Sequence, residues 1–378
     1  MAKNTRPKAI DLFCGVGGMS LGFEQAGFDV VAGFDADERS LRAYARNFPH
    51  AAARQTDLRK VSGDVVRTLA GIGHRTVDVV FGGPPCQGFS LMGKRSPDDP
   101  RNSLIFDFAR LVRQIRPRYF VMENVTGLMS GSCREHLESF LRRVKRAGYN
   151  VTAPVAVLDA CGLGVPQRRK RVFVLGARRG ETQQQYPKSN GEPLAFPTVW
   201  DAIGDLPNVD EFPGLLEADV FEGPLDKPSD YAAILRGEAV DAADRSRPPR
   251  RNSTGLSGCA RTQHRPETVA RFAATEPGTS EPVSRFYRLA KVGLSSALRA
   301  GTGPDRGSFM APRPIHPVYP RCITVREGAR LHSFPDWFSF DSTKWHGFRQ
   351  IGNSVPPFLA RAVATALLQA LAKKVARQ

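Results

Sequence analysis

The chain has 378 residues, of which 41% are hydrophobic, and its formal net charge is +17. That length has room for two domains, and the composition is that of a globular protein. An excess of positive charge this large attracts polyanions, so nucleic acid is the first candidate partner and an anionic membrane the second. No apolar run approaches membrane-spanning length, and the N-terminus lacks the apolar core of a secretory signal. We therefore expect a cytoplasmic enzyme.

The first half of the chain alternates short apolar runs with helical patterns. Strands are predicted at residues 8–15, 29–35, 77–83, 118–124 and 170–178, and helices at 18–28, 38–48, 103–115 and 135–148. This alternation is typical of an α/β fold with a parallel sheet covered on both faces.

The pattern breaks after about residue 185. A compact segment, "FPTVWDAIGDLP", is followed by polar, basic sequence rich in helix and strand breakers, such as "RSRPPRRNSTGLSG". Regular patterns return at residues 322–334 and in a helix predicted at 358–374. The irregular stretch is expected to be a second domain or a long insertion with functional loops.

The six cysteines, Cys14, Cys86, Cys133, Cys161, Cys259 and Cys322, are widely scattered and none lies in a C-x-x-C pair. The seven histidines are equally scattered. This distribution disfavours a zinc site and, in a cytosolic chain, a disulfide framework. We predict no metal.

The first predicted strand ends in a glycine-rich turn, "DLFCGVGG" (residues 11–18). Such turns bring backbone N–H groups and a helix N-terminus close to a ligand. Asp35, at the end of the next strand, is suited to holding a ribose hydroxyl. On this pattern alone NAD, FAD and S-adenosylmethionine all remain candidates, and so does a purely structural turn.

A second motif, "GGPPCQGFS" (residues 82–90), places Cys86 directly after Pro84 and Pro85. The two prolines fix the backbone before the thiol, as suits a nucleophile that must meet one atom of a substrate. Glu123 follows at the carboxyl end of the next strand, the edge where open parallel sheets bind ligands. A thiol and a carboxylic acid together suggest covalent catalysis with proton donation. A buried thiol and a salt-bridged glutamate are the alternatives.

Six motifs occur in order: "DLFCGVGG", "GGPPCQGFS", "ENV", "VPQRRKRVFVLG", "TVREGARLHSFPD" and "QIGNSVPP". In these motifs the chain resembles the bacterial DNA (cytosine-5)-methyltransferases, from about residue 8 to 365 except for 208–312. The resemblance implies a Rossmann-like sheet that binds S-adenosylmethionine, without a metal, and a smaller, irregular target-recognition domain. It places the catalytic domain at 1–195, completed by 345–378, and the recognition domain at 196–344.

The resemblance also implies roles for individual residues. Cys86 would attack C6 of a cytosine flipped out of duplex DNA, and Glu123 would bond the N3 side of the ring. Arg169 would hold the cytosine O2, with Arg171 as the other member of the arginine pair. Residues implied at the cofactor are Phe13, Gly15, Gly17, Gly18, Asp35, Asp57, Leu104, Asn353 and Ser354. The loop at residues 90–103 would close over the base.

Three positions depart from the usual pattern of this family. Ala36 follows Asp35 where a bulkier apolar residue often stacks on adenine, Cys14 stands where Ala or Ser is common, and His332 where Gln is common.

Two related alternatives remain. A transfer-RNA methylase would carry a "CFT" signature, which the chain lacks. An inactive DNA-binding relative is disfavoured by the intact Cys86, Glu123 and Arg169. Hydride transfer by an NAD enzyme would need neither Cys86 nor "ENV".

The expected partner is double-stranded DNA, bound by a monomer. A cognate restriction endonuclease is a possible further partner. A few arginines of the irregular stretch are expected to read bases. The candidates are Arg250, Arg251, Arg261, Arg265, Arg271, Arg285, Arg288, Arg299 and Arg306.

Overall fold

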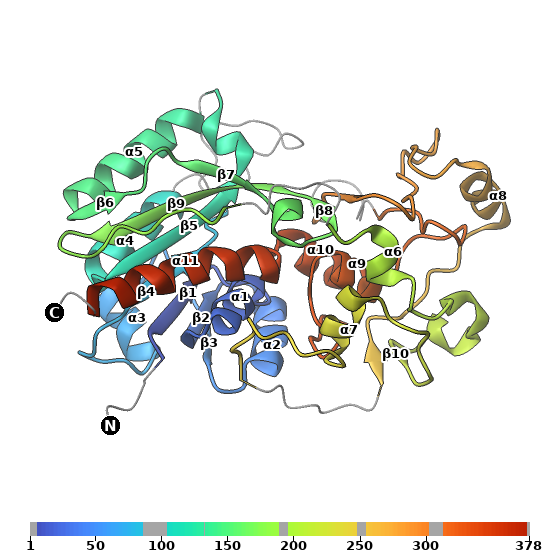
Figure 1. Ribbon diagram of the computed structural model, residues 1–378, viewed down its shortest axis with the longest axis horizontal. Helices are drawn as coiled ribbons and strands as arrows, with labels where there is room; N and C mark the ends of the chain where they lie inside the picture. Colours follow the sequence, from blue (N-terminus) through green and yellow to red (C-terminus); the bar gives the residue numbers. More distant parts are fainter. Residues whose placement is uncertain are drawn as a thin grey trace.

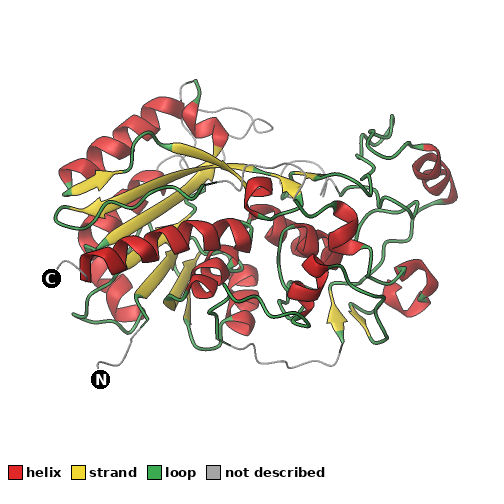
Figure 2. Ribbon diagram, viewed as in Figure 1, coloured by secondary structure: helices red, strands yellow, loops and turns green. Residues whose placement is uncertain are grey.

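The computed structural model describes residues 6–85, 104–131, 133–188, 196–247, 255–301 and 313–375. A mixed sheet forms one half of the molecule, and short helices and strands joined by long loops form the other (Figures 1 and 2). The strands of the main sheet are β1 (Lys8–Leu12), β2 (Asp29–Asp35), β3 (Ala52–Gln55), β4 (Val79–Gly82), β5 (Tyr119–Val125), β6 (Tyr149–Val151), β7 (Ala156–Asp159) and β9 (Lys170–Arg178).

The strand order is β3-β2-β1-β4-β5-β9-β6, with β7 also paired to β9. Strands β1 to β5 are parallel, whereas β9 runs antiparallel to β5, β6 and β7. Because β6 and β7 are antiparallel to β9, they run in the same direction as β1 to β5, and β9 alone is reversed. The parallel sheet expected from the alternating pattern is therefore confirmed for β1 to β5, and β9 is the strand that departs from it. The apolar run at residues 170–178 is a strand as predicted, but an apolar run does not encode strand direction.

Helices cover both faces of the sheet, and side chains of each strand alternate between two apolar cores. On one face, Val79 and Phe81 of β4 pack with residues of α1 and α11. On the other face, Val80 packs with residues of α3, α4 and α5. These helices are α1 (Gly18–Ala26), α2 (Glu38–Asn47), α3 (Gly63–Leu69), α4 (Leu104–Ile115), α5 (Cys133–Arg146) and α11 (Pro357–Val375).

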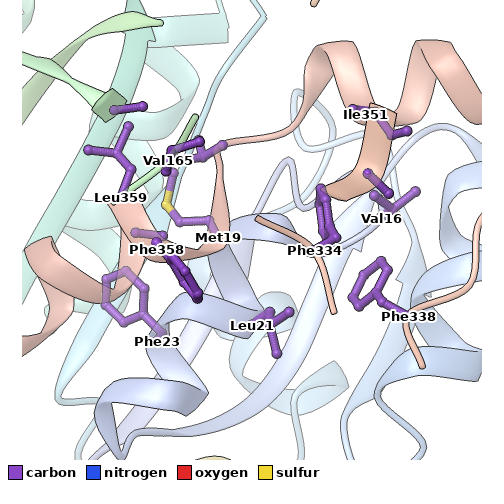
Figure 3. Close-up of a cluster of buried hydrophobic side chains, with 14 of the residues drawn as sticks. Val16, Met19, Leu21, Phe23, Val165, Phe334, Phe338, Ile351, Phe358 and Leu359 are labelled. Carbon is purple, nitrogen blue, oxygen red and sulfur yellow. The ribbon is translucent and has the colours of Figure 1, made fainter. Parts of the chain in front are cut away.

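Helices α1 and α11 pack closely although they come from opposite ends of the chain. A Cβ added at Gly22 of α1 would lie 2.5 Å from Ala360 Cβ, so only glycine permits this approach. Figure 3 shows α1 side chains, among them Met19 and Phe23, beside Phe358 and Leu359 of α11. The segment Lys344–Lys373 is long and apolar enough to cross a membrane by length and composition, a feature missed in the sequence, but it is mostly buried inside the protein.

The second half of the chain consists of short elements. They are α6 (Val199–Ile203), β10 (Val220–Phe221), α7 (Asp230–Arg236), β11 (Leu256–Ser257), α8 (Pro266–Ala274), β12 (Ser295–Ser296), α9 (Val325–Leu331) and α10 (Lys344–Asn353), with short 3-10 helices at Val209–Glu211 and Pro213–Leu216. The first half also contains β8 (Gln167–Arg168) and short 3-10 helices at Thr126–Met129 and Ala160–Leu163. Strand β12 pairs in parallel with β8, which joins this half to the sheet through the residues that precede β9.

Candidate active site

The glycine-rich turn lies between β1 and α1 and is held to the end of β2 by Asp35. The Gly15 N–H donates to Asp35 Oδ2 (2.8 Å), and the Asp37 N–H donates to Asp35 Oδ1 (2.9 Å). Phe13, Gly15 and Gly17 all have positive φ angles (64°, 54° and 97°), and a left-handed backbone at the non-glycine Phe13 is uncommon. Burial raises the pKa of Asp35. Each carboxylate oxygen still has a lone pair for a ligand hydroxyl.

The turn after α10 lies against the start of α1. A Cβ added at Gly18 would lie 2.5 Å from Val355 O and 3.1 Å from Ser354 Cβ, so these two backbone segments are in close contact. The structure thus brings Asn353 and Ser354 next to the glycine-rich turn, although more than 330 residues separate them in sequence.

Asp57 and Leu104 lie further along the carboxyl edge of the parallel strands. Asp57 follows β3, and both of its carboxylate oxygens accept from Arg59, with Nε to Oδ1 and Nη2 to Oδ2 at 2.8 Å each. The hydrogen bond from Arg59 lowers the pKa of this partly exposed carboxyl to about 2. Leu104 is the first residue of α4 and is partly exposed. A ligand contact at Asp57 would have to share the carboxylate with Arg59.

Glu123 and Arg171 form an ion pair across neighbouring strands. Glu123 lies opposite Phe173 in the β5–β9 pairing, so Arg171, two residues away on β9, is its diagonal neighbour on the same face. Arg171 Nε is 2.9 Å from Glu123 Oε1, and both side chains are largely buried. Burial raises the pKa of Glu123, and the charges of Arg171 and Arg169 partly offset the rise. The pair can present an acid and a cation to one ligand.

The loop that carries Cys86 begins against this ion pair. A Cβ added at Gly83 would lie 2.8 Å from Glu123 Oε2, and Asn124 Nδ2 donates to Pro84 O (3.0 Å). Cys86 itself and the predicted closing loop at 90–103 lie outside the described residues. The attachment of Pro84 to Asn124 is a positioning contact that the sequence analysis missed. The motif "ENV", which contains Asn124, was the available signal.

Arg169 has surroundings quite different from those of Arg171. It is 1% exposed. Nη1 donates to Leu298 O (2.8 Å), and Nη2 donates to Gly352 O (2.6 Å) and Ser354 O (2.9 Å). These bonds commit the guanidinium to backbone carbonyls, which leaves Arg171, beside Glu123, better placed than Arg169 for the contact expected at cytosine O2. Arg168 and Lys170, which alternate with the pair, are exposed.

The arginines of the irregular stretch differ in what they bind. Arg288 is buried and donates to the carbonyls of Phe272, Ala273, Thr275 and Val318. Arg271 pairs with the fully buried Glu281, and Arg261 lies 3.7 Å from Asp210. Arg265, Arg285 and Arg299 are exposed, and Arg250, Arg251 and Arg306 lie outside the described residues. Arg288 is therefore a structural residue rather than a base reader.

Over the part of the chain that the structure describes, no three or more His, Cys, Asp or Glu side chains are grouped as a metal ion would require. The five described cysteines, Cys14, Cys133, Cys161, Cys259 and Cys322, form no disulfide with one another.

Comparisons with known proteins place the chain in one family. Residues 7–369 match the family model described as C-5 cytosine-specific DNA methylase. The chain is 51% identical to the type II methyltransferase M.XorII of Xanthomonas oryzae pv. oryzae over 370 residues, covering 98% of this chain and 86% of that protein. It is 32% identical to M.AgeI of Thalassovita gelatinovora, covering 96% of this chain and all of that protein.

Among solved structures, an E. coli protein described as a prophage-encoded DNA modification methyltransferase is similar over 97% of this chain and 99% of its own, with a TM-score of 0.78 and 31% identity. The match of fold and sequence confirms the α/β methyltransferase architecture expected from the motifs. The chain belongs to the C-5 cytosine-specific DNA methylase family and is a DNA (cytosine-5)-methyltransferase.

Proposed function

We propose that this enzyme transfers a methyl group from S-adenosylmethionine to C5 of a cytosine flipped out of a specific duplex DNA sequence, through a covalent adduct between Cys86 and C6. The observation that carries the proposal is the ion pair of Glu123 and Arg171 beside Gly83 and Pro84, the residues that lead to Cys86. Its relatives M.XorII and M.AgeI are named type II methyltransferases, which supports a restriction–modification role. We place that role in the cytoplasm.

The residues at the edge of the sheet fit S-adenosylmethionine, which would supply an electrophilic methyl group. Asp35 would accept the ribose hydroxyls, and the left-handed turn at Gly15 leaves open space, because a Cβ built there meets no atom within 4 Å. Gly17 and Gly18 let the backbone lie close, with Phe13 and Leu104 at the adenosine and Asn353 and Ser354 at the methionine end. Asp57 would join the adenosine contacts.

The side chains of the site then act on the cytosine ring. The Cys86 thiolate adds to C6, and the electron pair of the C5–C6 bond moves into the ring toward N3 and O2. Glu123, with its raised pKa, holds a proton at N3, and Arg171 stabilises the charge that develops at O2. C5 becomes nucleophilic and would attack the methyl carbon, with the sulfur of S-adenosylhomocysteine as the leaving group. Loss of the C5 proton to a base or water restores the double bond and expels Cys86.

DNA binding is assigned to both domains. The catalytic domain, 1–195 with 345–378, would act on the flipped base, and the recognition domain, 196–344, would read the sequence. The +17 charge supports a duplex partner. Arg265, Arg285 and Arg299 are the exposed described candidates for base or phosphate contacts, with Arg250, Arg251 and Arg306 as further candidates from the sequence. One monomer per site is expected.

The direct test is expression in a host without cytosine methylation, followed by bisulfite sequencing of the plasmid. One short sequence should become protected in every copy, and Cys86→Ala should abolish protection while the protein still binds DNA. Methylation in transfer RNA but not in plasmid, or protection that persists in the variant, would overturn the proposal. Exchange of residues 208–312 with those of a relative of different specificity should change the protected sequence. An active chimera with the original specificity would refute the domain division.

A further inference from the structure

The segment that begins with β12, residues 295–301, is in backbone contact with the last turn of α10, at residues 352–354. A Cβ added at Gly352 would lie 2.4 Å from Ala300 N and 2.5 Å from Arg299 C. No side chain larger than hydrogen fits there without moving one of the two backbones. Residues 295–301 belong to the predicted recognition domain, and the turn carries Asn353 and Ser354. A displacement of residues 295–301 on binding would therefore displace residues 352–354 as well.

Arg169 joins the same two segments to the strand of the catalytic arginine. Its guanidinium bridges Leu298 O on one side and the carbonyls of Gly352 and Ser354 on the other. Arg169 lies directly before β9, and Arg171, the second residue of that strand, holds Glu123. A shift of either carbonyl segment therefore acts on the strand that positions Arg171.

A second buried link runs through His332 and Gln167. His332 Nε2 lies 3.0 Å from Ser354 O, and because a carbonyl only accepts, the imidazole must carry its proton on Nε2. Nδ1 then accepts from Gln167 Nε2 (3.2 Å), and Gln167 Oε1 accepts from the Leu298 N–H (3.3 Å). Both side chains are fully buried. Burial and the charge of Arg169 hold the pKa of His332 well below its usual range, so the ring stays neutral.

We propose that Gln167, Arg169 and His332 are positioning residues that couple the two substrates, so that seating of segment 295–301 on DNA orders the turn at 352–354 and tightens cofactor binding. The proposal rests on the proposed function for the identity of both ligands. By thermodynamic linkage the coupling is reciprocal: cofactor tightens DNA by the same factor as DNA tightens cofactor. The network links the two segments in this one arrangement, because the carbonyls of Leu298, Gly352 and Ser354 and the Leu298 N–H all bond to the same three buried side chains.

The test measures the dissociation constant of S-adenosylhomocysteine alone and with saturating duplex that carries the mapped site. The ratio of the two constants is the coupling factor, expected at roughly tenfold for the wild type. His332→Leu removes both bonds of the ring and should bring the factor close to one. His332→Gln can donate to Ser354 O and accept from Gln167, and should restore most of it. Gly352→Ala, which separates the two backbones, should behave as His332→Leu does.

The matched control is Gly214→Ala, because a Cβ at Gly214 meets no atom within 4 Å, and it should keep the wild-type factor. A melting curve of each variant shows whether it is folded. If His332→Leu does not fold, the coupling factor of Gly352→Ala decides the test instead. A wild-type factor of one, or variants that weaken both ligands separately while keeping the full factor, would overturn the proposal. Because the readout is binding, it is separate from the bisulfite result: methylation without coupling refutes only this inference, and absence of DNA methylation refutes the proposed function.

Discussion

Replacement of Glu123 by glutamine tests the chemistry with the least change in shape. The glutamine oxygen can still accept from Arg171 Nε, which lies 2.9 Å from the carboxylate. The amide, however, cannot hold a transferable proton at N3. General acid catalysis contributes roughly 10²- to 10⁴-fold, so the single-turnover rate should fall by that factor, which corresponds to about 3–5 kcal/mol of barrier.

The pH profile gives a second readout of the same variant. Burial raises the pKa of Glu123, so the protonated acid persists to higher pH than an ordinary glutamate, and the wild-type rate should fall as pH rises through that pKa. Glu123→Gln should lack this alkaline decline.

The assay is transfer of labelled methyl groups with enzyme in excess over DNA. Glu138→Gln is the matched control, since Glu138 pairs with Arg134 on the exposed face of α5. An unchanged single-turnover rate in Glu123→Gln, or an alkaline decline identical to the wild type, would refute this reasoning.

Three further changes test the supports of the site. Asn124→Ala removes the bond to Pro84 O and should lower the single-turnover rate by roughly 10²-fold through misplacement of the loop, with DNA affinity unchanged; a wild-type rate would contradict this. Asp35→Ala should raise the KM for S-adenosylmethionine by roughly tenfold and lower kcat less, whereas a fall in kcat at constant KM would remove Asp35 from the cofactor site. Burial would raise the pKa of Glu327, but Arg321 and its other partners lower it from 4.5 to about 2. Its stabilising contribution is therefore present above pH 4.5 and lost as pH falls toward 2. Denaturant titrations of Glu327→Gln should show a shallower acid dependence, and an identical profile would contradict the assignment.

The strands of the parallel half were predictable because their residues are buried on both faces and give continuous apolar runs, as in "DVVAGFD" and "RYFVMEN". Strand β3 was missed because its sequence, Ala-Ala-Arg-Gln, carries no apolar pattern: it is an edge strand with two exposed residues. Its place in the sheet depends on pairing with β2, which is a tertiary effect.

In the candidate site, too, features set by local sequence were predictable, whereas contacts that depend on strand register were not. The turns at Gly15 and Pro84 were visible as motifs, because special backbone conformations require particular residues. The ion pair of Glu123 with Arg171 depends on the antiparallel register of β5 and β9, which no local pattern specifies. Arg169 illustrates the limit most clearly. Its partners are backbone carbonyls, and every residue has one.

Not all of the arginines that contribute to the net charge lie on the surface, where they could attract DNA. Arg326 and Arg330 are fully buried, as Arg169 is. Arg330 is bonded to Asp205 and Asp336, and Arg321 binds Glu327 with both terminal nitrogens. Such pairs are locally neutral, and the low exposure of their members keeps them from reaching a phosphate.

The charge that attracts DNA therefore resides on exposed cations and not on these buried pairs. Within the predicted recognition domain, Arg265 and Arg285 are exposed, whereas four carbonyl partners hold Arg288 inside the protein. Arg285 also has a left-handed backbone (φ 58°) at the end of a tight turn held by Glu281. A side chain mounted on so constrained a turn loses less backbone freedom when it binds, which suits base contact better than a loose phosphate contact.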